Sequence, residues 1–256
     1  MWALSHTSYI APYSIIIGGR GYTIPETVYH LIMAELLFHT KLSASLFKGL
    51  SPWTNRLPGR MMHVNVLGCT LFAAISGSSA ATATTVGRIT LSELFKRGYD
   101  KDLAIGTLAG AGTLGFLIPP SIILIIYGVL SETSILKLFI AGIVPGLLLS
   151  LGFMGYVAIR ATLNPSLIPD ENIDATWRDR LNGLVDLGPV AFLILLVLGS
   201  MYAGFASPSE AAAVGVLGAV LVSAAQKTLS WKTLRMAPFP DRSDWKTRKM
   251  AKNPHA

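Results

Sequence analysis

The distribution of charge along the chain is the feature that most limits its possible folds. Asp, Glu, Lys and Arg are absent from four long runs and one shorter run: 61–87, 103–131, 138–159, 187–209 and 211–226. A helix that crosses the hydrocarbon core of a bilayer needs about 20 mostly apolar residues. The four long runs reach this length, and the fifth run is only a few residues shorter. The runs lack the alternating pattern of a membrane β-strand. The pattern therefore predicts an all-α, multi-pass membrane protein.

Composition agrees with a bilayer environment. Apolar residues make up 52% of the chain and charged residues only 14%, and the mean hydropathy is +0.53. A soluble domain usually carries about 25% charged residues, so this chain has too few to cover a water-exposed surface. Cys69 is the only cysteine, which excludes a disulfide scaffold.

The net charge of +7 does not indicate a nucleic-acid partner. Residues 227–256 hold eight basic and two acidic residues, so most of the excess belongs to this terminal segment. The basic residues are not interleaved with an aromatic platform of the kind that binds RNA. We expect the segment to be a solvated end, an end that faces anionic lipid, or a disordered end.

Lys and Arg counts predict an unusual path for the first run. Cytoplasmic flanks of membrane helices are rich in these residues, and with the basic tail in the cytoplasm the loop 88–102 and the link 160–186 fall there too. The connector ahead of the first run is equally basic, with Lys41, Lys48, Arg56 and Arg60. A single crossing would leave one basic flank outside. We therefore expect 61–87 to form a re-entrant helical hairpin.

Two neighbouring runs contain helix breaks. Ser76, Gly77, Ser78 and Ser79 supply backbone freedom and hydroxyl caps in the first run, and Pro119 and Pro120 interrupt the second. Paired discontinuous helices are typical of a transporter's binding site, where unwound carbonyls and hydroxyls suit an alkali cation and helix N-termini favour a carboxylate. The substrate path is predicted to include Thr82, Thr85, Pro119 and Pro120. The alternative is that these small residues only allow helices to pack closely.

Other polar residues in or near the runs favour structural roles. Ser207, Pro208 and Glu210 have the spacing of a capping box, Asp186 is expected to open a helix at the interface, and His63 is expected to be interfacial rather than a ligand. The chain has no G-x-S-x-G, H-E-x-x-H or Walker-type phosphate loop. We therefore predict that the protein is not an enzyme and holds no organic cofactor.

Several motifs, taken together, resemble the large membrane subunit of the tripartite ATP-independent periplasmic (TRAP) transporters, a DctM-like permease. The resemblance covers about 34–235. It rests on segments 72–83, 97–100, 106–109, 112–115, 118–121, 127–130, 141–147 and 208–213.

The resemblance implies a bacterial or archaeal inner-membrane permease driven by sodium. Its substrate would be an organic anion, such as a C4-dicarboxylate or sialic acid, delivered by a periplasmic binding protein. A small TRAP membrane subunit would be the other partner. The family's large subunit has two inverted halves, each with a hairpin, and moves like an elevator. The resemblance also implies one sodium site between the hairpin tip (Ser76, Gly77, Ser78, Ser79) and the broken helix that carries Gly112 and Thr113.

The family subunit is about twice as long, so we expect this chain to represent one half of an inverted-repeat transporter that does not transport alone. The expected divisions are 1–26, which matches poorly, a permease region at 27–235 and a basic tail at 236–256. Within the permease region we expect a hairpin at about 61–87 and spans at about 103–131, 138–159, 187–206 and 208–226. The rival interpretations are a non-transporting membrane fragment of a degraded gene, which only packs with other subunits, and a membrane hydrolase.

Overall fold

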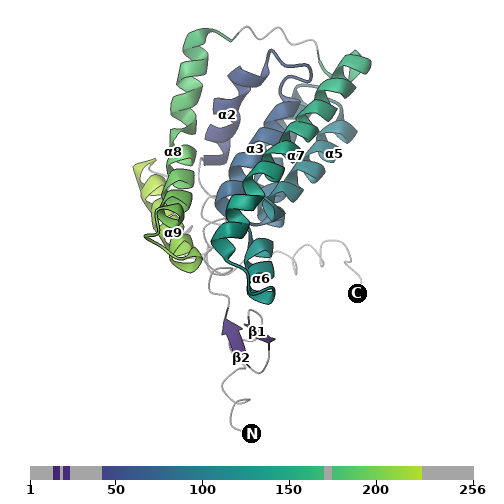
Figure 1. Ribbon diagram of the computed structural model, residues 1–256. Helices are drawn as coiled ribbons and strands as arrows, with labels where there is room; N and C mark the ends of the chain where they lie inside the picture. The colour runs from purple at the N-terminus through teal and green to yellow at the C-terminus, as the bar shows by residue number, and fades with distance from the viewer. Residues whose placement is uncertain (1–13, 18–19, 24–41, 170–174, 227–256) are drawn as a thin grey trace, which may run out of the picture.

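The computed structural model describes residues 14–17, 20–23, 42–169 and 175–226 (Figure 1). Helices dominate the described chain, as the charge-free runs predict. The exception is an antiparallel hairpin in which β1 (Ser14–Ile17) pairs with β2 (Arg20–Thr23). The all-α prediction therefore holds for the described residues from 42 onward and misses this hairpin. The basic tail lies outside the described residues.

The first charge-free run folds into two helices with a break between them. Helix α3 (Met62–Ser76) ends at Gly77, whose φ of +62° lies in the left-handed region that glycine adopts without steric cost. Helix α4 (Ser79–Lys96) begins at once, with Ser78 as its N-cap. The 15 residues of α3 span about 22 Å, less than the roughly 30 Å hydrocarbon core. A helix of this length fits a re-entrant hairpin better than a complete crossing.

The second run is broken where the two prolines predict it. Helix α5 (Lys101–Gly112) passes into the short 3₁₀ helix η1 (Thr113–Phe116), and α6 (Ile122–Leu130) begins only after Pro120. Proline has no backbone N–H and its ring collides with the preceding turn, so two consecutive prolines, Pro119 and Pro120, strongly disfavour a continuous helix.

Two helices are long and apolar enough to cross a bilayer, among the residues that the structure describes. They are α7 (Ile135–Leu163), which is followed by the short 3₁₀ helix η2 (Pro165–Leu167), and α8 (Trp177–Tyr202). Helix α9 (Pro208–Ala225) follows. The expectation that Asp186 is the first residue of a helix is wrong. Helix α8 begins about three turns earlier, at a capping box between Thr176 and Asp179.

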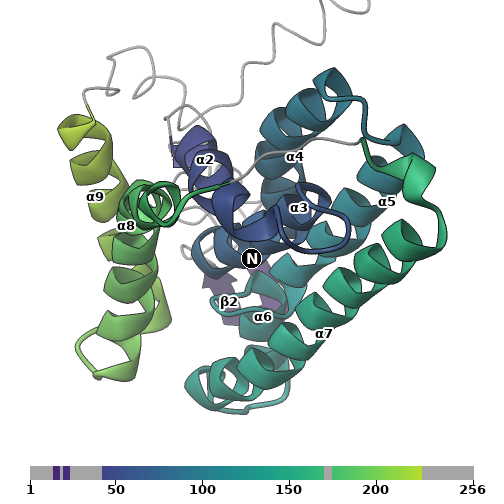
Figure 2. The same ribbon diagram turned by 90° about the horizontal axis from the view of Figure 1, so that it is seen from above.

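The helices form a bundle with α7 and α8 on opposite sides. In Figure 1 the helices α3, α5 and α7 lie in one group, while α8 and α9 lie at one side. Seen from above in Figure 2, α2 (Leu42–Thr54) and α3 lie between α7 and α8. Helix α2 packs closely on α8, since a Cβ added at Gly49 would lie 2.7 Å from the carbonyl oxygen of Gly183.

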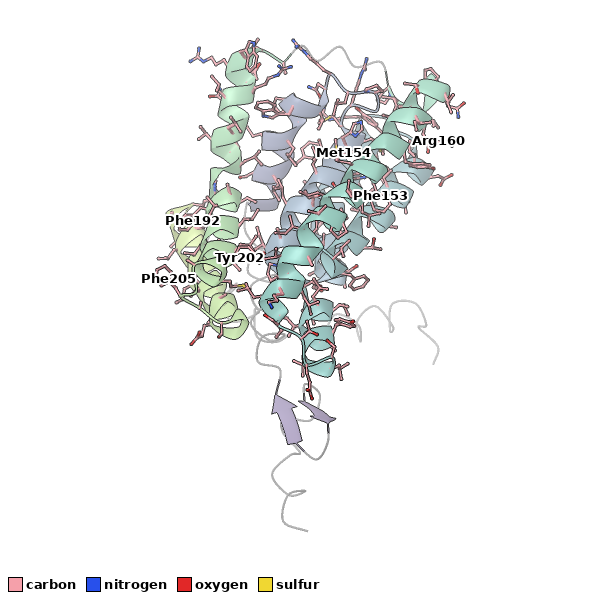
Figure 3. The ribbon with its side chains drawn as sticks, in the orientation of Figure 1. Phe153, Met154, Arg160, Phe192, Tyr202 and Phe205 are labelled. Atoms are coloured by element: carbon pink, nitrogen blue, oxygen red, sulfur yellow. The ribbon has the colours of Figure 1, made fainter. Side chains whose placement is uncertain are left out.

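The interior is apolar, and so is the surface. Phe72, Leu114, Phe139 and Leu193 fill the core. Large apolar side chains of α7 and α8 nevertheless face outward, and Phe192 and Phe205 lie on the outer side of α8 and of the turn after it (Figure 3). An exposed apolar surface of this extent is not compatible with water and is expected in a bilayer. The described chain has the fold of a helical membrane protein.

Candidate functional site

The tip between α3 and α4 is held by a buried pair of hydroxyls. Ser76 Oγ lies 2.9 Å from Thr82 Oγ1, and neither residue has measurable exposure. The backbone N–H of Gly77 donates to the carbonyl of Ala73, which completes the last turn of α3. Ser78 Oγ accepts from the N–H of Ala81 at 3.4 Å and so caps α4. The serines of this segment therefore end one helix and start the next.

The broken helix contacts this tip through its backbone. The N–H of Ile122, the first residue of α6, donates to the carbonyl oxygen of Gly77 at 3.2 Å. Gly115 in η1 faces the first residue of α4, because a Cβ at Gly115 would lie 2.7 Å from the backbone nitrogen of Ser79. One turn earlier, a Cβ at Gly112 would lie 2.9 Å from Ala83 Cβ. Glycine at 112 and 115 thus allows a backbone approach that any side chain would prevent.

Helix α7 supports the break from its other side. A Cβ at Gly142 would lie 2.6 Å from the carbonyl oxygen of Leu117, and one at Gly146 would lie 2.8 Å from Ile118 Cγ1. The hydroxyl of Ser121 donates to the carbonyl of Phe116 at 2.7 Å across the two prolines. The segment from Ile118 to Pro120 is therefore buried in protein, which is the condition for irregular backbone at membrane depth.

Four helix ends meet at this place. The C-terminal end of α3 and the N-terminal end of α6 are joined by the Gly77–Ile122 hydrogen bond, and η1 ends where Gly115 packs on the start of α4. Helix C-termini carry partial negative charge and favour cations, whereas N-termini favour anions. The same arrangement of half-helices serves ion and substrate sites in secondary transporters.

Of the residues predicted to form the cation site, Ser76, Gly77, Ser78, Ser79 and Gly112 lie at or near this tip, whereas the hydroxyl of Thr113 is turned to α5, and their role in binding sodium stays a prediction. Gly112 packs against Ala83, which lies one turn after Ser79 in α4. Gly115 packs against Ser78 and Ser79, although it was not predicted as a site residue. The signal for Gly115 was its place three residues after Gly112, in a segment that carries the family resemblance. Thr113 is exposed, and its hydroxyl donates to the carbonyl of Gly110 at 2.6 Å.

The residues predicted to line a substrate path are enclosed in the described chain. Thr82 donates or accepts in the pair with Ser76, Thr85 is 3% exposed, and Pro119 and Pro120 are buried. The outward-facing hydroxyl of α4 near the tip belongs to Thr84 instead. The substrate path therefore stays a prediction.

At the base of the hairpin, the end opposite the tip, the segment 97–100 links neighbouring elements by hydrogen bonds. Tyr99 is buried, and its hydroxyl accepts from the N–H of Met61 at 3.3 Å. Asp100 caps α5 through Leu103, and its own N–H donates to the carbonyl of Leu167 at 3.1 Å. The start of α3, the segment after α4 and the short helix η2 therefore lie together, which agrees with the equal basicity of both hairpin flanks.

Two further polar residues have structural partners. Glu210 accepts from both the N–H and the hydroxyl of Ser207, at 2.7 and 2.8 Å, so the predicted capping box is confirmed. His63 is buried, with Nε2 2.6 Å from the carbonyl oxygen of Pro58. Within the described ranges, no group of three or more His, Cys, Asp or Glu side chains could hold a metal ion.

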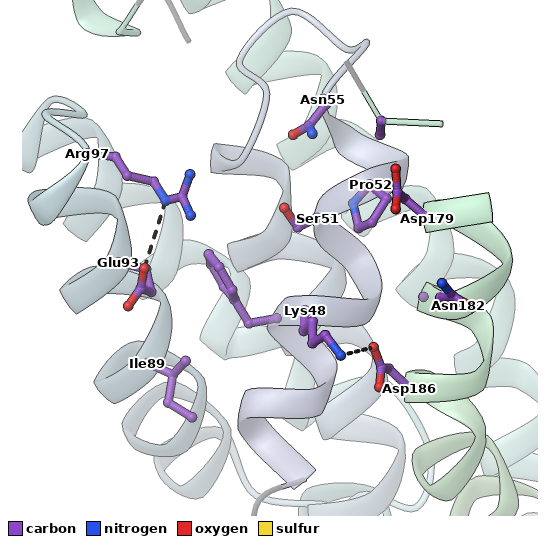
Figure 4. A pocket seen from close by; sticks show the side chains of 13 residues that line it. Lys48, Ser51, Pro52, Asn55, Ile89, Glu93, Arg97, Asp179, Asn182 and Asp186 are labelled. Atoms are coloured by element: carbon purple, nitrogen blue, oxygen red, sulfur yellow. Dashed lines mark ion pairs between the residues drawn. The ribbon is translucent and has the colours of Figure 1, made fainter. Parts of the chain in front are cut away.

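A cleft that the sequence did not predict, lined by apolar surface and several charged side chains, lies between α2, α4 and α8 (Figure 4). Its volume is about 570 Å³. Lys48 on α2 pairs with Asp186 on α8 at 3.0 Å, while Glu93 and Arg97 form an ion pair along α4 at 3.8 Å. Lys48 is largely exposed, so its ion pair contributes little to stability.

The fold is that of a helical membrane protein, and the meeting of broken helices is typical of secondary transporters. Comparison with known families gives the specific group. Residues 24–243 match the family described as the tripartite ATP-independent periplasmic transporter, DctM component, and the chain belongs to this family.

Curated relatives agree with this assignment. The chain is 34% identical over 188 residues to the C4-dicarboxylate TRAP transporter large permease protein DctM of Vibrio cholerae, which covers 73% of this chain and 40% of the relative. It is 35% identical over 224 residues to the DctM protein of Pseudomonas aeruginosa, covering 86% of this chain and 50% of the relative. Identity is 35% over 228 residues to the ectoine/5-hydroxyectoine TRAP transporter large permease protein UehC of Ruegeria pomeroyi, covering 89% and 51%. The chain spans about half the length of these relatives, or less.

Proposed function

We propose that this chain forms part of a large permease that moves a small organic anion across the inner membrane of a bacterium or archaeon, coupled to sodium. The partners in this proposal are a small TRAP membrane subunit and a periplasmic substrate-binding protein. The chain acts by binding and conformational change rather than by catalysis. Its membership of the TRAP large-permease family supports the transport role.

The observation that carries the proposal is the junction of α3, α4, η1 and α6 at Gly77. The sodium ion would bind beside the ends of α3 and η1, among backbone carbonyls and the hydroxyls of Ser76 and Ser78. Such oxygen atoms are hard ligands, and the negative ends of two helix dipoles point to the same place. The residues proposed to form this site are Ser76, Gly77, Ser78, Ser79, Gly112 and Thr113.

The substrate proposal rests on helix N-termini and on the relatives. Helices α4 and α6 begin at the junction, and helix N-termini favour anionic groups such as carboxylates. Relatives at nearly equal identity are named for C4-dicarboxylate and for ectoine. Ectoine also carries a carboxylate, so this group is the shared chemistry that we propose the site recognises, with Thr82, Thr85, Pro119 and Pro120 shaping the path.

Sodium binding can be tested on the purified chain. We expect NaCl, compared with equal concentrations of KCl or choline chloride, to raise the midpoint of thermal unfolding in detergent. Ser78→Ala should reduce that difference, because it removes both the α4 cap and a proposed ligand. Ser92→Ala is the matched control, since this exposed serine lies on the same helix and bonds only the carbonyl of Ile89. Equal responses to sodium and potassium in the unchanged protein would refute a sodium site.

Transport is tested separately in membrane vesicles that contain the complete large permease of which this chain forms part, together with the small subunit, and that are supplied with the binding protein. Under an inward sodium gradient, Ser78→Ala should lower uptake of a labelled dicarboxylate while Ser92→Ala leaves it unchanged. Unchanged uptake in Ser78→Ala would favour the interpretation that the serine-rich break serves only helix packing.

A further inference from the structure

Arg180, in the first turn and a half of α8, is buried without a neutralising partner. Its side chain is only 7% exposed, and its Nε has no hydrogen-bond acceptor. The one contact of its guanidinium recorded within the described residues is with the ring of Trp177, 5.2 Å from the centroid. Stacking on an aromatic face is favourable for a cation, but it satisfies none of the five guanidinium N–H donors.

The carboxylates nearest in sequence on α8 are already committed. Asp179 accepts from both the N–H and the hydroxyl of Thr176, at 2.9 and 2.6 Å, in the capping box. Asp186 pairs with Lys48 of α2 at 3.0 Å. A buried charge without a counter-ion is strongly unfavourable, so the arrangement calls for an anion from outside the described chain.

The surroundings of Arg180 indicate which anion fits. Trp177 is 70% exposed, so the guanidinium stacked on it lies next to the surface of the protein. Below Trp177, the outer face of α8 is apolar and exposed at Leu181, Leu184 and Val185. An exposed tryptophan above an apolar helix face, beside arginine, is typical of the depth at which lipid headgroups meet hydrocarbon.

We propose that Arg180 and Trp177 bind the phosphate of a membrane phospholipid, whose acyl chains lie along Leu181, Leu184 and Val185. A phosphodiester presents two oxygen atoms that match the planar fork of a guanidinium. The proposal does not depend on sodium coupling or on the transported substrate, since Arg180 lies on α8 and not in the hairpin or the broken helix. It makes the start of α8 a lipid-anchored element of the permease.

Native mass spectrometry of the full chain tests the proposal. The protein is solubilised, stripped of lipid and titrated with phosphatidylglycerol, and the fraction of protein ions with bound lipid gives the affinity. Arg180→Gln should weaken binding about tenfold, as expected for the loss of a charge-assisted contact. Arg178→Gln is the matched control, because Arg178 lies in the same turn but is exposed. Equal affinity in Arg180→Gln and the unchanged protein would overturn the proposal.

Measurements on the unchanged protein keep the test valid if Arg180→Gln fails to fold. Diacylglycerol with the same acyl chains lacks the phosphate and should bind about tenfold more weakly than phosphatidylglycerol. Equal binding of the two lipids would overturn the proposal, and so would displacement of the lipid by excess inorganic phosphate, which would indicate a site for free phosphate.

The sequence offers one internal competitor for Arg180, the acidic residues just before α8. A variant with Asp170→Asn, Glu171→Gln and Asp174→Asn should bind phosphatidylglycerol as the unchanged protein does. Lipid binding that appears only after these three changes would show that a carboxylate of the chain neutralises Arg180, and the lipid site would be refuted.

Discussion

Replacing Gly115 with alanine tests whether the broken helix and the hairpin tip form one unit. The added Cβ would lie 2.7 Å from the backbone nitrogen of Ser79, 2.8 Å from the carbonyl carbon of Ser78 and 2.9 Å from Ser79 Cα. All three atoms are backbone, so no side chain can rotate away. Ordinary contact begins at 3.4 Å, so η1 must move by about 0.7 Å relative to the start of α4.

The expected magnitude follows from that movement. Overpacking in a well-packed interior costs about 1–3 kcal/mol, and a further effect comes from the hydrogen bond between Ile122 N–H and the Gly77 carbonyl. This bond is already 3.2 Å long, and a shift of about 0.7 Å would break it at a cost of about 0.5–1.5 kcal/mol. Against this, alanine gains about 0.5–1 kcal/mol over glycine in helical backbone. We expect a net destabilisation of about 0.5–4 kcal/mol.

The assay is unfolding of the purified chain in detergent, by heat and by denaturant, with and without sodium. Gly106→Ala is the matched control, because Gly106 lies in α5 and a Cβ there would meet no atom within 4 Å. Gly106→Ala should leave stability unchanged or raise it, while Gly115→Ala should lower both stability and the response to sodium. If Gly115→Ala is as stable as Gly106→Ala, the close contact between η1 and the tip is not present in the folded protein.

Two further predictions concern other contacts. Gly183→Ala should destabilise the α2–α8 contact by about 1–3 kcal/mol, since its Cβ would lie 2.7 Å from the carbonyl oxygen of Gly49. Gly188→Ala is the control and should not destabilise this contact, because a Cβ at Gly188 would meet no atom within 4 Å. The rate of proteolysis in the α2 region compares the two variants, and equal rates would contradict the contact. Tyr99→Phe should lower the free energy of unfolding by about 1 kcal/mol, because it removes the acceptor of the Met61 N–H at the hairpin base. An unchanged midpoint of thermal unfolding in Tyr99→Phe would refute that role.

Local chemistry was enough to predict where the helices break. Glycine at 77 and paired prolines at 119 and 120 limit the backbone whatever the rest of the chain does, so their effect is visible in the sequence. The capping box at Ser207 was predictable for the same reason, since all its atoms lie within four residues.

The start of α8 shows where reading the sequence failed. The charges of Arg178, Asp179 and Arg180 were assigned to a polar link, although Thr176 and Asp179 have the spacing of a capping box. The length of a charge-free run locates the part of a helix that lies inside the hydrocarbon. It does not detect further turns of the same helix that extend into the headgroup region and carry charged residues beside one apolar face. The burial of Arg180 has no signal in the local sequence.

The sequence by itself determined that the chain is a helical membrane protein with one interrupted hairpin and one interrupted helix, because charge-free length and backbone chemistry are local properties. Only the tertiary structure decided that the two interruptions meet. The hydrogen bond from Ile122 to Gly77 and the fit of Gly115 against Ser79 join residues about 40 positions apart. Such contacts depend on how the helices pack against one another, and a pattern along one chain does not carry that information.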